Sequence, residues 1–282
     1  MFFFFFHSIL WDFQPWILYL ILSLAGGLIA FMKNKKINSP EYVSLGGFLV
    51  IFIALSLSRF KLPHYIFVTF PFAAIFAARF LLGLTDKQRW LLYVQGFFNS
   101  LFWIIIVVVL TLLFPATNIF LPIVLVALFA LSWYFFIKQN SLTNRLFFSA
   151  ITTIIGFNLV LASHFYPQLV GDYQAGGNVG RMIKEKGVEL DKFVYLHVHE
   201  HSIDFYQEGI SEGINIWDIE GLESGVWIYT NEETYEKIQR DNLPCKLVKE
   251  FNDFPVTQLK IPFLYKETRG ENVDKVYLLE RI

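Results

Sequence analysis

The sequence predicts a multi-pass α-helical membrane domain over residues 1–164, followed by a small α/β domain over residues 165–282. Of the 282 residues, 55% are hydrophobic and only 17% are charged, whereas charged residues make up about a quarter of an ordinary soluble domain. The charges are also unevenly placed: the first region holds 10 Lys/Arg and 3 Asp/Glu, and the second holds 13 and 21. Two regions adapted to different solvents are therefore joined in one chain.

Six transmembrane helices are predicted in the first region. Stretches with few or no charges recur at lengths close to the roughly 20 apolar residues that a bilayer crossing requires. The uncharged stretch 90–137 fits two helices, divided near "FPATNIFLP" because Pro115 and Pro122 disfavour one continuous helix. The spans are expected over residues 15–32, 42–58, 64–84 and 146–162 and, as two helices, within 90–137.

The basic residues between the spans predict the orientation. The connecting segments 33–36, 85–89 and 138–145 would share one side of the membrane and hold seven Lys/Arg, whereas 59–63 and 114–122 hold two. Since basic residues accumulate on the cytoplasmic side, the first set is expected in the cytoplasm. With six spans both chain ends face outward, so the α/β domain is expected to be extracytoplasmic.

The second region contains short segments of alternating type. Residues 174–187 form a plausible amphipathic helix with Gly187 as its stop, and residues 231–242 a polar helix capped by Asn231. Strands are expected over residues 192–199 ("KFVYLHVH") and 225–230 and in "KLVKEF", "VTQLKI" and "KVYLLER", with a short helix or loop over "SIDFYQEG". The acidic charge of this region argues against nucleic-acid binding. Cys245 is the only cysteine, so a disulfide within the chain is excluded.

Two motifs in this region favour ordinary structural roles. "GGNVG" (176–180) resembles part of a phosphate-binding loop, but no strand precedes it, so a flexible helix entry is favoured over a nucleotide site. "HVHEH" places His197, His199 and His201 on one strand face if the strand persists. Three alternating histidines offer zinc ligands, but the spacing suggests no fourth. Histidines that face water or form local hydrogen bonds are the expectation, and no metal or cofactor is predicted.

The segment "SRFKLPHYIF" (58–67) is the strongest candidate for a binding site in the membrane region. Arg59 and Lys61 lie on the side where the topology rule disfavours basic residues. In one interpretation, their long side chains snorkel to the interface from helix ends. In the other, two cations beside a proline-fixed turn bind a lipid phosphate or pyrophosphate, and the low local dielectric strengthens that contact.

The stretch "SLSRFKLPHYIFVTFPFAAIFAARFL" (56–81) resembles a motif of the aminoarabinose (4-amino-4-deoxy-L-arabinose) transferase and protein O-mannosyltransferase family of membrane glycosyltransferases. The motif is carried by Ser58, Lys61, Leu62, Pro63, Tyr65 and Pro71. "FHSILWDFQPW" (6–16) is similar to the aromatic entry of the preceding helix in that family. "HSIDFY", "GVWIYT" and "FLYKETRGENVDKVYLLE" resemble the extracytoplasmic C-terminal domain of bacterial relatives. The resemblance covers the whole chain and corresponds to the C-terminal half of these enzymes.

This resemblance implies an inverting transfer of a sugar from a polyprenyl-phosphate carrier. The acceptor would be a hydroxyl on the outer face of the bacterial inner membrane, on lipid A or on another cell-envelope glycan or protein. Arg59 and Lys61 would stabilise the charge that grows on the leaving phosphate. His64 and Tyr65 would donate hydrogen bonds to the phosphate or the sugar, and Pro63 would fix the turn. A structural role at the start of the helix remains open for His64.

The resemblance also implies that a part of the enzyme is encoded elsewhere. Relatives are about twice as long, and their first half carries the acidic general base on an outward loop. Asp12 is the only acid in the outward parts of residues 1–164 and is expected to be interfacial, so the catalytic residue is not identified. "MFFFFFH" lacks the basic start of a secretory signal and suits an internal interfacial segment. We therefore expect the C-terminal half of a longer enzyme, which is either split, with a separately encoded N-terminal half, or cut short by a mis-assigned reading frame.

Two further functional classes were weighed. The chain could be a non-catalytic membrane module whose outward α/β domain binds a cell-envelope partner, and the absence of a general base favours this alternative. A transporter or channel would place ionisable residues in the middle of its spans. The spans here have almost none, and Arg79, one turn from a cytoplasmic end, is explained by snorkelling.

Overall fold

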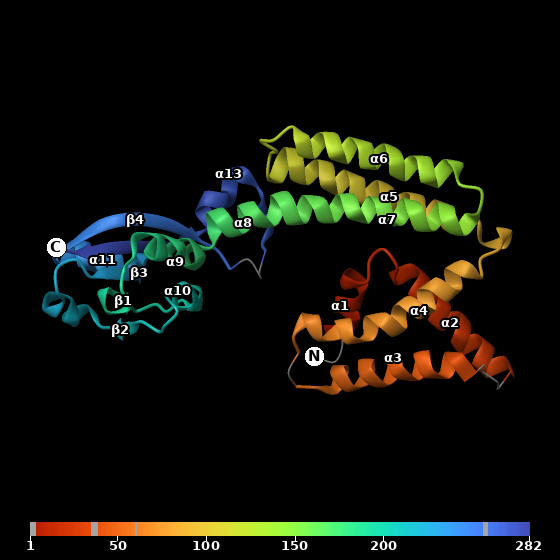
Figure 1. Cartoon of the computed structure of the whole chain (residues 1–282), viewed down its shortest axis with the longest axis horizontal. Coiled ribbons are helices and arrows are strands. Elements are labelled where there is room, and N and C mark those ends of the chain that lie inside the picture. Colours follow the sequence, from red (N-terminus) through yellow and green to blue (C-terminus); the bar gives the residue numbers. More distant parts are fainter. Residues whose placement is uncertain (1–3, 35–38, 60, 256–258) are drawn as a thin grey trace. The chain divides into compact units, whose positions relative to one another are not determined.

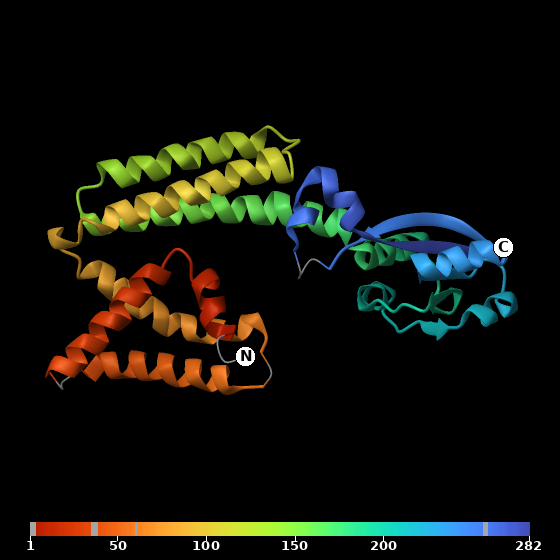
Figure 2. The same cartoon turned by 180° about the vertical axis from the view of Figure 1, so that it is seen from behind.

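The computed structural model describes residues 4–34, 39–59, 61–255 and 259–282 (Figure 1). The chain divides into two compact units. The first consists of Met1–Ile106 and Asn118–Asn158, and the second of Val107–Thr117 and Leu159–Ile282. Among the described residues, the first unit contains helices but no strands and the second carries all the strands, as the view from behind also shows (Figure 2).

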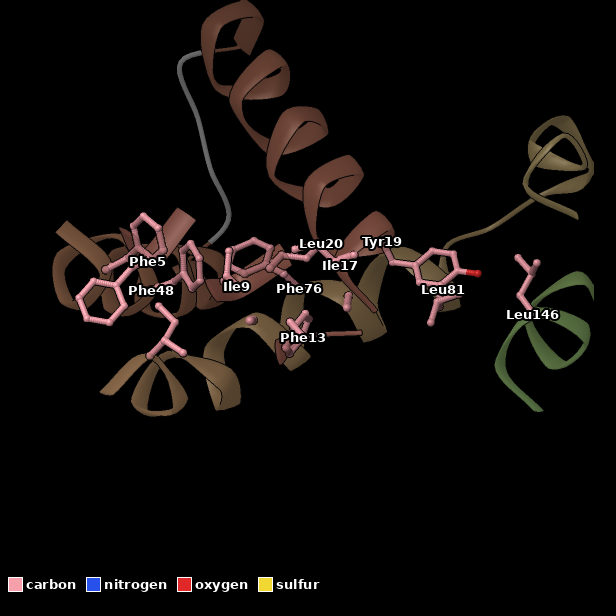
Figure 3. Close-up of a cluster of buried hydrophobic side chains, with 14 of the residues drawn as sticks. Phe5, Ile9, Phe13, Ile17, Tyr19, Leu20, Phe48, Phe76, Leu81 and Leu146 are labelled. Atoms are coloured by element: carbon pink, nitrogen blue, oxygen red, sulfur yellow. The ribbon is translucent and has the colours of Figure 1, made fainter. Parts of the chain in front are cut away.

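The first helices of the chain pack around a core rich in aromatic side chains. They are α1 (Phe4–Asp12), α2 (Ile17–Asn34), α3 (Ser39–Leu57), the 3₁₀ helix η1 (Pro63–Thr69) and α4 (Phe70–Leu82). Figure 3 shows side chains from α1, α2, α3 and α4 converging on this core, among them Phe5, Ile9, Phe48 and Phe76. Phe5 is completely buried. The phenylalanine run that suggested an interfacial segment is thus, at Phe5, a packing element.

Three longer helices complete the helical part. After a short 3₁₀ turn η2 (Asp86–Gln88), α5 (Leu91–Val108) continues into the π-helical segment η3 (Val109–Leu113). α6 (Phe120–Lys138) and α7 (Leu142–Val160) follow, and α7 runs on through a second π-helical segment, η4 (Leu161–Phe165), into α8 (Tyr166–Tyr173). Helices α5, α6 and α7 lie side by side in both views (Figures 1 and 2). The Ser132 hydroxyl on α6 lies 2.8 Å from that of Thr153 on α7, a polar contact typical of helix pairs in lipid.

The predicted class of fold is confirmed. Within the described part of the chain, four helices are long and apolar enough to cross a membrane: Pro63–Leu82, Leu91–Leu113, Phe120–Lys138 and Leu142–Tyr173. Two shorter apolar helices, Ile17–Gly27 and Val43–Leu57, lie at the other expected spans. These spans were sought among the described residues alone, and residues 35–36 of the first basic segment lie outside them. Residues 114–119 separate α5 and its π-helical end from α6, close to the prolines that predicted the division.

The α/β part is built on a five-stranded mixed sheet. The strands are β1 (Phe193–Leu196), β2 (Glu212–Ile214), β3 (Trp227–Asn231), β4 (Cys245–Asp253) and β5 (Asp274–Arg281), in the order β2-β1-β3-β5-β4. β1 pairs in parallel with β2 and β3, whereas β5 is antiparallel to β3 and β4. The helices and turns between them are α9 (Ala175–Lys186), η5 (Leu190–Lys192), α10 (His201–Gln207), η6 (Ile216–Gly221), α11 (Glu232–Arg240), α12 (Ile261–Leu264), α13 (Lys266–Arg269) and η8 (Gly270–Asn272).

Both faces of the sheet are covered. On one face, Val179 and Ile183 of α9 and Ile203 of α10 pack against sheet residues such as Tyr195. On the other face, Ile238 of α11 and Ile219 of η6 pack against Val194, Leu196 and Ile228. Successive residues of β1 therefore enter opposite cores, and all four are buried. This explains why the strand is continuously apolar, as expected of a strand with both faces covered.

Two of the predicted strands differ from the structure. The strand expected over residues 192–199 ends at Leu196, because His197 adopts a left-handed backbone conformation with φ of 59°. The three histidines therefore do not share a strand face, and that expectation is wrong. Of the expected strand "VTQLKI", residues 256–258 lie outside the described residues. Leu259 and Lys260 belong to no strand, and Pro262 instead lies in the first turn of the short helix α12, where its missing N–H is tolerated.

Candidate functional site

The basic turn between α3 and η1 holds Arg59 and Lys61; residue 60 lies outside the described residues. Arg59 is exposed, whereas Lys61 is half-buried. The Lys61 ammonium donates a hydrogen bond of 2.5 Å to the backbone carbonyl of Ser56 in the last turn of α3, and it lies 5.9 Å from the centre of the Phe5 ring. A cation at a helix C-terminus satisfies a carbonyl that has no partner within the helix. Lys61 therefore caps α3 while its charge stays at the turn.

The sequence gives η1 a buried edge and two open edges. Leu62 is extended, and Pro63 at the first helical position lacks only an N–H that a helix start leaves unpaired. In a 3₁₀ helix, side chains three residues apart lie in line. Ile66 and Thr69 form the buried edge, each completely covered. The remaining positions are exposed: Pro63, His64, Tyr65, Phe67 and Val68.

His64 and Tyr65 therefore face away from the core of the helices, next to the basic turn. Their rings meet edge to face, with centroids 4.8 Å apart, which limits the rotation of both. Further along the same two edges of η1, Phe67 and Val68 are 51% and 60% exposed. A polar and cationic end thus passes within one turn into an apolar strip, an arrangement that matches an amphiphile with an anionic headgroup.

The structure brings the four predicted residues Arg59, Lys61, His64 and Tyr65 together on one short segment. Two neighbours of the turn were not foreseen as parts of the site, namely the side chain of Phe5 and the carbonyl of Ser56. The Ser56 hydroxyl is buried and has no hydrogen-bond partner among the described residues. In the sequence, only the position of Ser56 near the end of the helix that precedes the turn could have indicated that this residue contributes to the site. Asp12, at the end of α1, is exposed.

The described helices, the α/β domain that follows them and the basic turn define a multi-pass membrane protein with a compact attached α/β domain. No family model and no curated protein matches the chain. Two solved structures do. One is ArnT from Cupriavidus metallidurans bound to undecaprenyl phosphate, at 14% identity and a TM-score of 0.64. The other is the same protein in the apo state, at 16% identity and a TM-score of 0.62.

Each likeness covers 100% of this chain and 52% of the solved chain, so the sequence spans about half the length of the structures that it matches. The fold is therefore that of the C-terminal half of an ArnT-type transferase, and the resemblance seen in the sequence is confirmed at this level. At such low identity the likeness describes the fold alone. The roles of the four site residues remain predictions.

Proposed function

We propose that this chain is the part of a membrane glycosyltransferase that holds a polyprenyl-phosphate-linked sugar donor. The sugar would pass to a hydroxyl on lipid A or on another cell-envelope glycan or protein, at the outer face of the inner membrane. The observation that carries the proposal is the likeness of the whole chain to ArnT bound to undecaprenyl phosphate. The geometry of the basic turn supports it independently, because the turn combines cationic and apolar surfaces within a few residues.

In this proposal, Arg59 and Lys61 contact the donor phosphate. The guanidinium offers paired hydrogen-bond donors and the ammonium a point charge. The interaction of each cation with the leaving phosphate would strengthen as negative charge develops there during inversion at the anomeric carbon. His64 and Tyr65 donate hydrogen bonds to the phosphate or the sugar. The isoprenoid chain lies along Phe67 and Val68, which are exposed on the same edges of η1 as His64 and Tyr65. Pro63 keeps these groups in register.

The general base is proposed to come from a separately encoded polypeptide. Asp12 is the only carboxylate in the outward parts of residues 1–164 under the predicted topology. Asp12 is the last residue of α1, a helix that contributes Phe5 to the aromatic core and contains no other carboxylate. Transfer would then need an acidic residue near the donor, which we propose comes from the N-terminal half. The α/β domain would lie on the extracytoplasmic side of the membrane, where the transfer is proposed to take place.

A second candidate is a non-catalytic membrane module whose α/β domain binds a cell-envelope partner. One observation favours it: a hollow of about 550 Å³ lies between the α8–α9 junction and β4. Its lining includes Asp172, Asn178, Arg181, Lys249 and Glu250, a mixture of donors and acceptors suited to a polar ligand. In the first candidate the basic turn of the helical part binds the ligand, whereas in the second candidate the α/β domain does.

Donor binding can be measured directly. The full chain in lipid nanodiscs is titrated with radiolabelled undecaprenyl phosphate. Arg59→Ala and Lys61→Ala are compared with Lys87→Ala, which removes an exposed cation from a segment that is predicted to face the cytoplasm. Hydrogen bonds to charged groups contribute about 1.5–3 kcal/mol each. Each site variant should therefore weaken binding about tenfold or more, while Lys87→Ala stays within about twofold.

A further variant tests whether position 61 requires a cation. Lys61→Arg keeps a cation and a donor for the Ser56 carbonyl and should restore most of the binding. In a second assay, the chain is co-expressed with a candidate partner and sugar transfer from the polyprenyl donor is followed; the same variants should lower the rate. Equal losses in the site variants and Lys87→Ala would contradict the proposal, as would a wild-type chain that shows no saturable binding.

A further inference from the structure

Two histidines and an aspartate meet at the start of α10. The His199 Nε2 atom lies 2.9 Å from Asp204 Oδ2, and the His201 Nδ1 atom lies 3.7 Å from the same oxygen. One ligand atom from each of the three residues falls within 4.8 Å of the others. The two imidazole rings meet at a centroid distance of 4.7 Å. Two imidazole nitrogens and one carboxylate oxygen thus lie close together at the surface of the α/β domain.

The backbone conformation explains how these three residues come together. The left-handed conformation of His197 ends β1 and turns the chain, so that His199 is carried back over Tyr195, with their rings 4.7 Å apart. His201 opens α10, and Asp204 follows it by one helical turn on the same face. His197 itself leaves the group, because its Nδ1 atom lies 3.2 Å from the hydroxyl of Thr234.

The carboxylate of Asp204 is held by a neighbouring side chain. The Tyr195 hydroxyl donates to Asp204 Oδ1 at 2.7 Å, whereas Oδ2 is the oxygen that faces the two histidines. The Asp204 side chain is only 11% exposed, while that of His201 is 91% exposed. A carboxylate with one oxygen fixed by a hydrogen bond and the other directed at imidazoles is the arrangement that orients ligands in metal sites.

We propose that His199, His201 and Asp204 bind one divalent cation of the zinc type. With metal–ligand bonds of about 2.0–2.2 Å, tetrahedral zinc holds its ligand atoms about 3.3–3.5 Å apart. The observed separations of 2.9 and 3.7 Å from Asp204 lie on either side of that value, and the exposed His201 ring is able to turn the remaining distance. Imidazole donors favour zinc and related transition metals over Ca²⁺ and Mg²⁺, which prefer oxygen ligands.

Such a cation would join the turn after β1 to the first turn of α10. Three protein ligands leave a fourth position, which would take water or an anionic oxygen of a bound molecule. The site lies within the second unit and requires no residue of the basic turn. Its existence is therefore independent of the proposed glycosyl transfer.

The test uses the full chain in detergent, purified with an affinity tag that contains no histidine and treated with EDTA before dialysis. Zinc chloride is titrated by calorimetry, and Co²⁺ is added in parallel to follow the visible absorption of a tetrahedral ion. We expect one zinc per chain. His199→Ala, His201→Ala and Asp204→Asn should each weaken zinc binding at least tenfold, and the cobalt absorption should be lost.

His197→Ala is the matched control, because it removes the same kind of side chain from the same turn but outside the cluster; zinc affinity should change less than twofold. Asp204→Asn keeps an oxygen that accepts from Tyr195, and His201 is almost fully exposed, so both variants should unfold at the wild-type temperature in EDTA. The proposal is overturned if the wild-type chain shows no saturable zinc binding. It is also overturned if His201→Ala binds zinc as tightly as wild type, or if His197→Ala loses as much affinity as His199→Ala.

Discussion

The guanidinium of Arg269 lies over the ring of Phe114, with its central carbon 4.0 Å from the ring centroid. Its nitrogens donate to three backbone carbonyls: Nε to Phe263 at 2.9 Å, and Nη2 to Leu113 at 2.7 Å and Leu264 at 2.8 Å. Although charged, the residue is only 8% exposed. Arg269 therefore ties α12 and α13 to the end of the π-helical segment η3, a carbonyl-rich place where a helix would otherwise leave acceptors unpaired.

Replacing Arg269 should release this connection. Arg269→Lys keeps the charge but loses the planar group that stacks and reaches several carbonyls at once. Hydrogen bonds from charged groups and a desolvated cation–π contact together suggest a loss of about 2–4 kcal/mol of local stability. Hydrogen exchange of the amides in residues 261–269 should accelerate by at least tenfold in the full chain. Lys266→Ala, on the exposed side of α13, should leave that exchange close to wild type.

The glycines of α9 should differ sharply in their tolerance of a side chain. A Cβ at Gly180 would lie 2.6 Å from Tyr206 Cδ2 and 3.0 Å from Tyr206 Cβ, whereas one at Gly177 would meet nothing within 4 Å. Overpacking of this kind costs about 1–3 kcal/mol, while alanine in a helix interior gains up to about 1 kcal/mol over glycine. Gly180→Ala should therefore lower the unfolding temperature of the α/β domain, and Gly177→Ala should leave it unchanged or raise it.

Differential scanning calorimetry of the full chain in detergent measures both glycine variants. For a domain of this size, 1 kcal/mol corresponds to a few degrees, so the two midpoints should differ by about 5 °C or more. A Gly180→Ala chain as stable as Gly177→Ala would mean that α9 and α10 are not packed as closely as the structure describes.

How far the sequence predicted the fold depended on whether the signal was local. Helix α9 was expected over residues 174–187, and its end was confirmed because Gly187 takes the left-handed conformation that a helix stop favours. The cap of α11 was equally local: the Asn231 side chain accepts from the Thr234 amide. The apolar spans were recognisable because lipid imposes length and composition directly.

Features that depend on distant residues were missed. "GGNVG" was interpreted as a helix entry and does begin α9, but the sequence did not indicate that Tyr206 of α10 packs against Gly180. The histidine turn was taken as a strand, since alternation alone does not reveal the left-handed residue that ends β1 at Leu196. The cluster with Asp204 followed only from that turn. The four residues of the basic segment were predictable as a group because they are adjacent in sequence.

Asp253 should make the stability of the α/β domain depend on pH. Gln174 at the N-terminus of α9 provides no side-chain cap, and Asp253 of β4 instead accepts from the Ala175 amide at 3.1 Å. Burial raises the pKa of the Asp253 carboxyl above its usual 3.8, outweighing the lowering by that amide. At pH values between the ordinary pKa of Asp253 in the unfolded chain and its raised pKa in the folded chain, the folded state binds more protons than the unfolded state. The free energy of unfolding therefore falls as pH rises through that range.

Asp253→Asn removes the charge but keeps an oxygen that accepts from Ala175. It should therefore raise the unfolding temperature at pH 7, and the gain over wild type should disappear below about pH 4, near the ordinary carboxyl pKa. Calorimetry between pH 4 and 7 provides the measurement, with Glu236→Gln on the exposed side of α11 as control. A variant less stable than wild type at pH 7 would show that the capping bond needs the ionised carboxylate.

The orientation of the helices can be tested by labelling single cysteines. Cys245→Ser first removes the only native thiol, and cysteines then replace Arg59, Lys87 or Trp217, which are all exposed. The distribution of basic residues predicts that positions 59 and 217 face outward and position 87 faces the cytoplasm. A membrane-impermeant maleimide should therefore label positions 59 and 217 in spheroplasts, and position 87 only after permeabilisation. Because a donor phosphate at the outer face could reach Arg59 and Lys61 only in this orientation, labelling of position 87 but not 59 in sealed cells would exclude the proposed site.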